Sequence, residues 1–206
     1  MKIQIIKYDS VDSTNNVAIR RIKKGKIKPT LIIANLQKRG RGQYGRKWTS
    51  YRGNIFMSFY FNLKKSVTIR SLSKKIYTTL KKSLEKFVNE KITIKLPNDL
   101  LIKGSKVCGI LQETVTYNND KYFIVGIGIN VINSPKINNK QVSFLQKYNN
   151  NKINKNDIYT NIKNNFEKFI WLKNMYLIGD IGNTETKICL FNNKKKLLKK
   201  KSLNTT

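Results

Sequence analysis

The sequence predicts an α+β fold, a mixed and largely antiparallel sheet with helices packed on one face. Short segments rich in β-branched and aromatic residues recur between residues 2 and 131, with polar turns between them. Only a few segments show helical spacing of apolar residues. Three strands follow one of these helices without another helix between them, which is typical of antiparallel pairing.

The first elements are a strand over residues 2–8 and a short helix over residues 17–24. The turn between them, residues 9–16, is dense in side-chain oxygens, and Ser13 or Thr14 is suited to cap the helix. A helix cap is the simpler interpretation of this turn, and a ligand-binding role is the alternative.

Two strands, residues 30–37 and 54–61, flank a loop at residues 40–48 that holds three glycines, three cations and a tryptophan. Glycines allow unusual backbone angles and let N–H groups converge on an anion. The guanidinium of Arg41 matches a carboxylate or a phosphate, and Trp48 offers a flat face for stacking. The loop therefore predicts a site for a ligand that carries an anion and a flat ring. A basic surface hairpin is the alternative.

The remaining elements are expected in the order helix 69–87, strands 92–96, 107–115 and 122–131, a surface connection 133–156 and a closing helix 157–172. The apolar stripe of helix 69–87 is assigned to the core. Lys95 shares a strand face with Thr93 at a strand end, where it could neutralise a carboxylate or phosphoryl oxygen during transfer. A solvated lysine is the alternative. Asn98 and Asp99 could bind a metal–nucleotide or only make an Asx turn.

Composition excludes several functions. The 206 residues include no histidine, so Ser-His-Asp and Cys-His catalysis and the HExxH zinc site are excluded. No apolar run approaches the roughly 18 residues of a membrane span, and the first residues lack a secretory signal. The two cysteines follow no metal or redox spacing, and we assign no metal ligands. A cytoplasmic protein is expected.

The formal net charge is +31, from 42 Lys and Arg against 11 Asp and Glu. This excess predicts salt-sensitive attraction to nucleic acids, so a non-enzymatic basic nucleic-acid-binding protein is one hypothesis. The cations are spread along the whole chain, however, which favours compositional bias over a dedicated nucleic-acid site.

Five motifs occur in an order that resembles the catalytic domain of biotin protein ligases, over residues from about 1 to 172. They are Asp12-Ser-Thr-Asn15, Gln37 with Gly40-Arg-Gly-x-x-Gly-Arg-Lys-Trp48, Lys95-x-Pro-Asn-Asp99, Lys106-x-x-Gly-Ile-Leu-x-Glu113 and Gly126-Ile-Gly-Ile-Asn130. The resemblance implies a biotin/lipoate ligase-like fold and an ATP-dependent enzyme. Such enzymes make biotinyl-5′-AMP and transfer biotin to a lysine of a biotin carboxyl carrier domain, as in acetyl-CoA carboxylase. The resemblance also implies ATP with Mg²⁺ as cofactors and a possible homodimer.

The resemblance further implies roles for single residues. Lys95 and Arg41 are the implied catalytic residues, between the biotin carboxylate and the α-phosphate. The implied biotin-binding residues are Ser13, Thr14, Asn15, Gln37, Gly40, Arg41, Gly42, Gln43, Lys95 and Gly109. The implied ATP-binding residues are Arg41, Arg46, Trp48, Asn98 and Asn130. A lipoate or octanoate ligase or transferase of the same fold remains the alternative enzyme.

Two positions depart from the family pattern. Gln43 stands where relatives commonly have a second arginine, so we expect weaker retention of the adenylate. Leu96 stands where many have an aromatic residue, and only a packing change is expected. We see no helix-turn-helix segment before the catalytic motifs, so specific DNA binding is not expected, and neither is the small C-terminal barrel of many relatives.

The last residues resemble a different family. Met175-Tyr-Leu-Ile-Gly-Asp-Ile-Gly-Asn-Thr-Glu-Thr186 is similar to the opening of a type III pantothenate kinase. We therefore expect two domains, a ligase domain over residues 1–172 and an incomplete kinase-like fragment over residues 175–206. About 30 residues cannot build a kinase fold, so no pantothenate kinase activity is expected.

Overall fold

The structure, a computed structural model, describes residues 3–63, 67–172, 175–181, 185–192 and 197–204. The chain divides into two compact units, one reaching Lys163 and the other starting at Asn164. No helix in the described ranges is both long and apolar enough to span a lipid bilayer.

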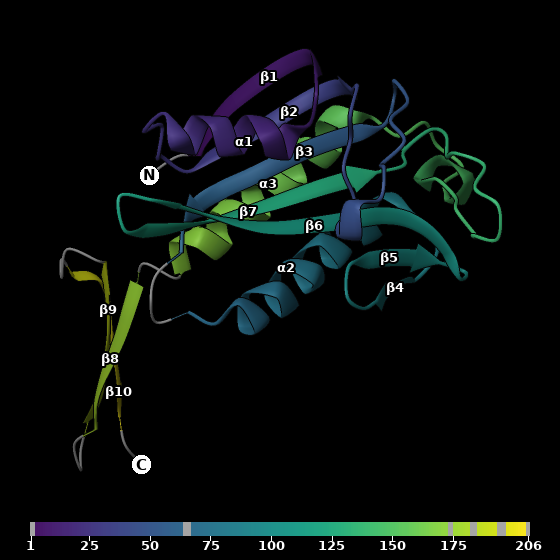
Figure 1. Cartoon of the computed structure of the whole chain (residues 1–206). Coiled ribbons are helices and arrows are strands. Elements are labelled where there is room, and N and C mark those ends of the chain that lie inside the picture. Colours follow the sequence, from purple (N-terminus) through teal and green to yellow (C-terminus); the bar gives the residue numbers. More distant parts are fainter. Residues whose placement is uncertain (1–2, 64–66, 173–174, 182–184, 193–196, 205–206) are drawn as a thin grey trace. The chain divides into compact units, whose positions relative to one another are not determined.

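A seven-stranded mixed sheet forms the first unit (Figure 1). Its strands are β1 (Gln4–Val11), β2 (Thr30–Gln37), β3 (Ile55–Asn62), β4 (Ile92–Lys95), β5 (Asp99–Ile102), β6 (Ser105–Tyr117) and β7 (Asp120–Ile129). Their order is β1-β2-β3-β7-β6-β5-β4. Only the β1–β2 pair is parallel among them. The predicted α+β class and the largely antiparallel sheet are confirmed.

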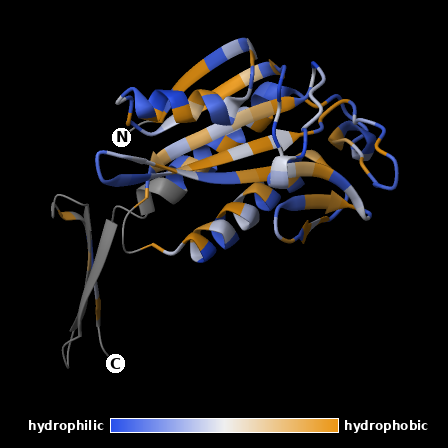
Figure 2. Cartoon of the chain, in the orientation of Figure 1, coloured by the Kyte–Doolittle hydropathy of each residue, from blue (hydrophilic) through white to orange (hydrophobic). Residues whose placement is uncertain are grey.

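Three α-helices accompany this sheet. They are α1 (Thr14–Lys23), α2 (Ile69–Leu84) and α3 (Lys155–Leu172), with short 3-10 turns at Gln43–Gly45, Glu85–Phe87 and Leu145–Tyr148. The amphipathic spacing that predicts α2 is visible as alternating hydrophobic and hydrophilic bands in Figure 2. Leu72, Ile76 and Leu80 on its apolar side are fully buried.

The helices lie on both faces of the sheet, which corrects the expectation of a single covered face. Helix α1 packs its Val17, Ala18 and Ile22 against Tyr60 of β3 and Ile124 of β7. Helix α2 lies on the opposite face (Figure 1), where Ser73 donates a hydrogen bond of 2.6 Å to Gln112 of β6. Gln112 and its neighbour Glu113 point to opposite faces, because side chains alternate along a strand. A near-continuous apolar strand such as β3 requires cover on both faces.

The start of α1 differs slightly from the predicted helix. Helix α1 begins at Thr14, three residues before the apolar stripe, and Ser13 is its N-cap with extended backbone. The Ser13 side chain makes no capping hydrogen bond. The side-chain oxygen of Gln37 accepts a 2.8 Å hydrogen bond from the Thr14 backbone N–H instead, so the end of β2 ties down the helix start.

The second unit contains a separate antiparallel sheet of β8 (Met175–Ile181), β9 (Glu185–Asn192) and β10 (Leu197–Asn204), in the order β10-β9-β8. Strand β10 was not predicted from the sequence. The Gly182-Asn183-Thr184 turn, part of the kinase-like motif, lies outside the described residues.

Candidate active site

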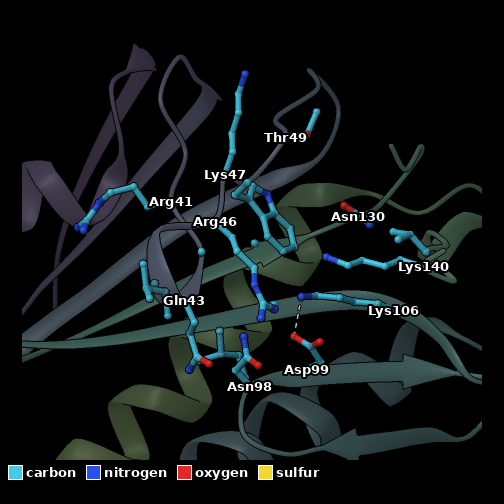
Figure 3. Close-up of a pocket in the computed structure, with 18 of the residues that line it drawn as sticks. Arg41, Gln43, Arg46, Lys47, Thr49, Asn98, Asp99, Lys106, Asn130 and Lys140 are labelled. Atoms are coloured by element: carbon cyan, nitrogen blue, oxygen red, sulfur yellow. Dashed lines mark ion pairs between the residues drawn. The ribbon is translucent and has the colours of Figure 1, made fainter. Parts of the chain in front are cut away.

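A cavity of about 530 Å³ opens on the α1 side of the sheet. The glycine-rich loop, the β4–β5 hairpin, strands β6 and β7 and residues 135–142 line it (Figure 3). The structure brings together nearly all of the predicted site residues here: Ser13, Thr14, Asn15, Gln37, Arg41, Gly42, Gln43, Arg46, Trp48, Lys95, Asn98, Gly109 and Asn130. Gly40 is the one predicted site residue that is not among the lining residues.

The glycine-rich loop is a narrow hairpin. The Gly42 N–H donates to the Arg46 carbonyl at 2.6 Å, and the Trp48 N–H donates to the Gly40 carbonyl at 2.9 Å. Gly40 is buried, and a β-carbon there would lie 2.6 Å from the Trp48 carbonyl oxygen. Gly40 therefore closes the hairpin, and the cations of the loop are held on a defined backbone.

One end of the cavity holds a network of polar side chains. The Thr14 hydroxyl donates to the Gln37 side-chain oxygen at 3.1 Å, and the Ser58 hydroxyl lies 2.7 Å from the Thr14 hydroxyl. Ser58 also lies 2.5 Å from Asn15 Oδ1. Ser13, Thr14 and Asn15 are at most 3% exposed. Buried groups held by mutual hydrogen bonds are suited to recognise a polar ligand head group.

The network continues to two charged residues. Asn15 Nδ2 donates to Glu113 Oε2 at 2.7 Å, and Arg41 Nη2 lies 2.7 Å from the same oxygen. Sequence reasoning assigned no role to Ser58 or Glu113. The signal for Ser58 was present, as a lone hydroxyl between apolar residues of a buried strand, and Glu113 closes one of the quoted motifs.

The adjoining part of the cavity is built around Trp48. A β-carbon at Gly109 or at Gly128 would lie 2.5 Å from atoms of the Trp48 indole, so both strands are open to the ring only because they carry glycine. Lys106 Nζ lies 5.2 Å from the centre of the indole and 2.6 Å from Asp99 Oδ1. Gly109 thus lines the cavity, and in this structure the Trp48 indole lies against it.

Positive charge gathers at this part of the cavity. In Figure 3 the ends of Arg46, Lys106 and Lys140 point toward the same space, whereas Lys47 points away. Lys95, at the end of β4, is exposed and lines the cavity opposite Asp99, its partner in the β4–β5 register. Such a cluster of cations is suited to a polyanionic ligand.

Three buried polar atoms of the lining residues have neither a hydrogen-bond partner nor an ion-pair partner among the described residues. They are Arg41 Nε, Trp48 Nε1 and Asn130 Oδ1. Leaving such groups unpaired costs free energy, roughly 1–3 kcal/mol for each, and native proteins rarely do so without a ligand or water to satisfy them. These three atoms are therefore available for hydrogen bonds with a ligand or with water in the cavity.

The buried cysteine beside the cavity is not a nucleophile. Burial raises the pKa of the Cys108 thiol to about 12, so the thiol stays protonated at neutral pH. The cavity lining instead offers lysines, arginines, amides, hydroxyls and the Asp99 carboxylate.

A family profile and several curated relatives match this chain. A sequence profile of the biotin/lipoate A/B protein ligase family matches residues 8–130, more than half of the chain. The bifunctional ligase/repressor BirA of Escherichia coli is 34% identical over 125 residues, covering 59% of this chain and 38% of that protein. The biotin--[acetyl-CoA-carboxylase] ligase of Paracoccus denitrificans is 30% identical over 128 residues, covering 60% of this chain and 53% of the relative. The chain thus spans only about two-fifths to one-half of these relatives.

Solved structures show the same fold. The biotin protein ligase of Leishmania major in complex with biotinyl-5-AMP has a TM-score of 0.67 at 17% identity, covering 98% of both chains. The Aquifex aeolicus biotin protein ligase in complex with biotin and ATP has a TM-score of 0.64 at 22% identity, covering 98% of this chain and 99% of that chain. Together with the profile match over residues 8–130, this fold shows that the chain belongs to the biotin/lipoate A/B protein ligase family.

Proposed function

We propose that this chain joins biotin to ATP as biotinyl-5′-AMP and then transfers biotin to a lysine of a biotin carboxyl carrier domain. One observation carries the proposal: a single cavity holds a buried polar network beside a cationic, tryptophan-lined compartment. The two parts meet along β7, where Gly126 faces Asn15 and Gly128 faces Trp48. Residues two apart on a strand are separated by about 7 Å, so an acid and a nucleotide bound there would be neighbours.

In the proposed first step, a biotin carboxylate oxygen attacks the α-phosphorus of ATP. The bond from that phosphorus to the bridging oxygen breaks, and pyrophosphate leaves. Both reactants are anions, so Arg41 and Lys95 would lower their repulsion and stabilise the charge that develops in the transition state. Holding both reactants in one cavity contributes further through orientation.

In the proposed second step, a neutral lysine amine of the carrier attacks the acyl carbon of the adenylate. An amide forms, the bond between the acyl carbon and the phosphate oxygen breaks, AMP leaves and the amine loses a proton to solvent. The ring head group of biotin would bind at Ser13, Thr14, Asn15 and Gln37, and the adenylate at Arg46, Trp48, Asn98 and Asn130. The name of one curated relative, the biotin--[acetyl-CoA-carboxylase] ligase of Paracoccus denitrificans, supports biotin as the acid.

Magnesium would arrive with ATP. In the part of the chain that the structure describes, no group of three or more Asp, Glu, His or Cys residues could hold a metal ion. Asp99, the one carboxylate among the described lining residues, is already paired with Lys106. This fits a magnesium ion held mainly by phosphate oxygens and water, in which role it offsets the triphosphate charge.

The test is ATP–pyrophosphate exchange with biotin, lipoate and octanoate as alternative acids, followed by transfer to a purified biotin carboxyl carrier domain. We expect exchange with biotin and labelling of one carrier lysine. Exchange with lipoate or octanoate but not with biotin would instead indicate a lipoate or octanoate ligase. The archaeal lipoate protein ligase of Thermoplasma acidophilum is similar in fold, with a TM-score of 0.61.

We also propose that residues 175–206 are a fragment similar to the start of a type III pantothenate kinase, joined to a ligase domain over residues 1–172. The fragment supplies no kinase on its own. Pantothenate-dependent consumption of ATP above background would refute this.

A further inference from the structure

Glu113 holds two residues of the cavity through one oxygen atom. Its Oε2 accepts hydrogen bonds of 2.7 Å from Asn15 Nδ2 and from Arg41 Nη2. Glu113 lies in β6 and points to the α1 side of the sheet, where the cavity opens. Its side chain is 24% exposed, so the ion pair with Arg41 is only partly screened by water.

Asn15 fixes this carboxylate from the interior. Asn15 is 2% exposed, and its side-chain oxygen lies 2.5 Å from the Ser58 hydroxyl. Its amide nitrogen donates to Glu113 and, at 3.4 Å, to the Leu111 carbonyl. Both N–H groups of the Asn15 amide are therefore used within the protein, and only its oxygen can still accept a hydrogen bond from a ligand. This makes Asn15 a support for Glu113.

Among the described residues, Glu113 is the one side chain that binds the Arg41 guanidinium. One of its terminal nitrogens binds Glu113, while its Nε is buried without a partner among the described residues. Arg41 is one of the residues that line the cavity. A ligand anion that approaches Arg41 would share it with Glu113, because the carboxylate already neutralises part of its charge.

We propose that Glu113 is a positioning residue that keeps Arg41 facing the cavity and competes with the carboxylate of the bound acid for it. This inference rests on the proposed function, in which Arg41 binds that carboxylate. The competition weakens binding of the free acid. A weaker interaction between Arg41 and the free acid leaves more of the binding energy of Arg41 to stabilise the transition state.

The experiment compares biotin with biotinol, in which a neutral alcohol replaces the carboxylate, by calorimetric titration of the full chain. In Glu113→Gln the side-chain oxygen still accepts from Asn15, but the competing charge is gone. We expect the affinity for biotin relative to biotinol to rise about 3- to 10-fold, as for a partly exposed charge pair. The affinity for biotinol should stay within about 2-fold of wild type, because the contact with Asn15 is retained.

Glu90→Gln is the matched control, because it neutralises a carboxylate paired at 2.6 Å with Lys103, and neither residue lines the cavity. This control variant should leave the ratio of the affinities for biotin and biotinol unchanged. In an Arg41→Gln background, Glu113→Gln should no longer change the ratio. If Glu113→Gln does not fold, Glu113→Asp keeps the charge but lengthens the contact with Arg41, and a smaller rise is expected.

Equal changes for biotin and biotinol would mean that Glu113 only supports the fold, and a fall in the ratio would mean that Glu113 assists binding. Either result overturns the inference and leaves the proposed ligase activity intact. A wild-type chain that binds neither compound would instead remove the proposed function, and this inference with it.

Discussion

At the scale of single residues, the glycines of β7 decide which side chains cover the sheet inside the cavity. A β-carbon at Gly126 would overlap the Asn15 side chain, and one at Gly128 would lie 2.5 Å from the Trp48 indole. The two glycines are two residues apart on the same face. Alanine substitutions at these two positions therefore add the same methyl group but displace different side chains.

We predict that Gly126→Ala raises KM for biotin and Gly128→Ala raises KM for ATP, each by about 10-fold or more. Overpacking of this kind costs roughly 1–3 kcal/mol, which here displaces Asn15 or Trp48. Steady-state exchange kinetics with each substrate varied in turn measures both constants, and each variant is the control for the other. If both variants raise KM for the same substrate, the proposed division of the cavity into a biotin part and an ATP part is wrong.

Gln43 is the second residue with a specific prediction. It lines the cavity and extends toward Asn98 in Figure 3, but as an amide it brings no charge to an adenylate. We predict that Gln43→Arg lowers release of free biotinyl-adenylate and stray labelling of nearby lysines by about 5-fold, since a charged hydrogen bond exceeds a neutral one by roughly 1 kcal/mol.

Chromatography of released adenylate and mass spectrometry of labelled lysines give the two readouts. Tyr44→Arg is the control, because Tyr44 is 85% exposed and the same charge is added one residue away. Unchanged release and labelling in Gln43→Arg would contradict the role of this position.

At the scale of elements, α1 depends on contacts at its start, because its own cap is weak. Ser13 makes no capping hydrogen bond, and no acidic residue lies in the first turn. Asp12 compensates by binding both terminal nitrogens of Arg20 at 2.8 Å, and it accepts from Asn16 at 2.9 Å. The hydrogen bonds from Arg20 hold the pKa of Asp12 well below its ordinary value of 3.8.

We predict that Asp12→Asn lowers the free energy of unfolding by about 1 kcal/mol at pH 7, because the two-point ion pair is partly exposed. A carboxyl with a depressed folded-state pKa contributes stability above its unfolded pKa, near 4, and loses that contribution as pH falls below this value. Urea unfolding at pH 7 and at pH 3 is the measurement. The two proteins should differ less at pH 3, and a difference independent of pH would contradict this account.

The sequence predicted most elements for physical reasons that also explain the exceptions. Strand β2 and helix α2 were located because their apolar patterns are strong and their flanking residues polar. The helical cover on the second face of the sheet was missed, since a fully apolar strand such as β3 does not tell which helix covers which side. Strand β10 was missed because lysines dominate it and no alternation is visible.

At the scale of the whole molecule, the charge of +31 is the dominant electrostatic feature. We predict that any binding to double-stranded DNA falls roughly 10³-fold between about 50 mM and 200 mM salt, with no preference between sequences. Fluorescence anisotropy with two unrelated duplexes tests this. Sequence-specific binding that survives the higher salt would favour a nucleic-acid function.

The candidate site was predictable to the extent that its residues lie in short motifs. Gln37, Lys95 and Asn130 are far apart in sequence, and the structure brings them to one cavity. The contacts between motifs were not predictable, because they depend on strand register. Glu113 meets Asn15 across a separation of 98 residues, and Trp48 covers Gly128 only because β6 and β7 pair as they do.

The central claim is that this cavity adenylates biotin, and biotin-dependent ATP–pyrophosphate exchange by the wild type and by Lys95→Ala tests it most directly. Losing one preorganised cation should slow exchange by about 10²–10³, or roughly 3–4 kcal/mol. Lys91→Ala, at an exposed lysine outside the cavity lining just before β4, should exchange like the wild type. No exchange by the folded wild type, or full exchange by Lys95→Ala, would contradict the account.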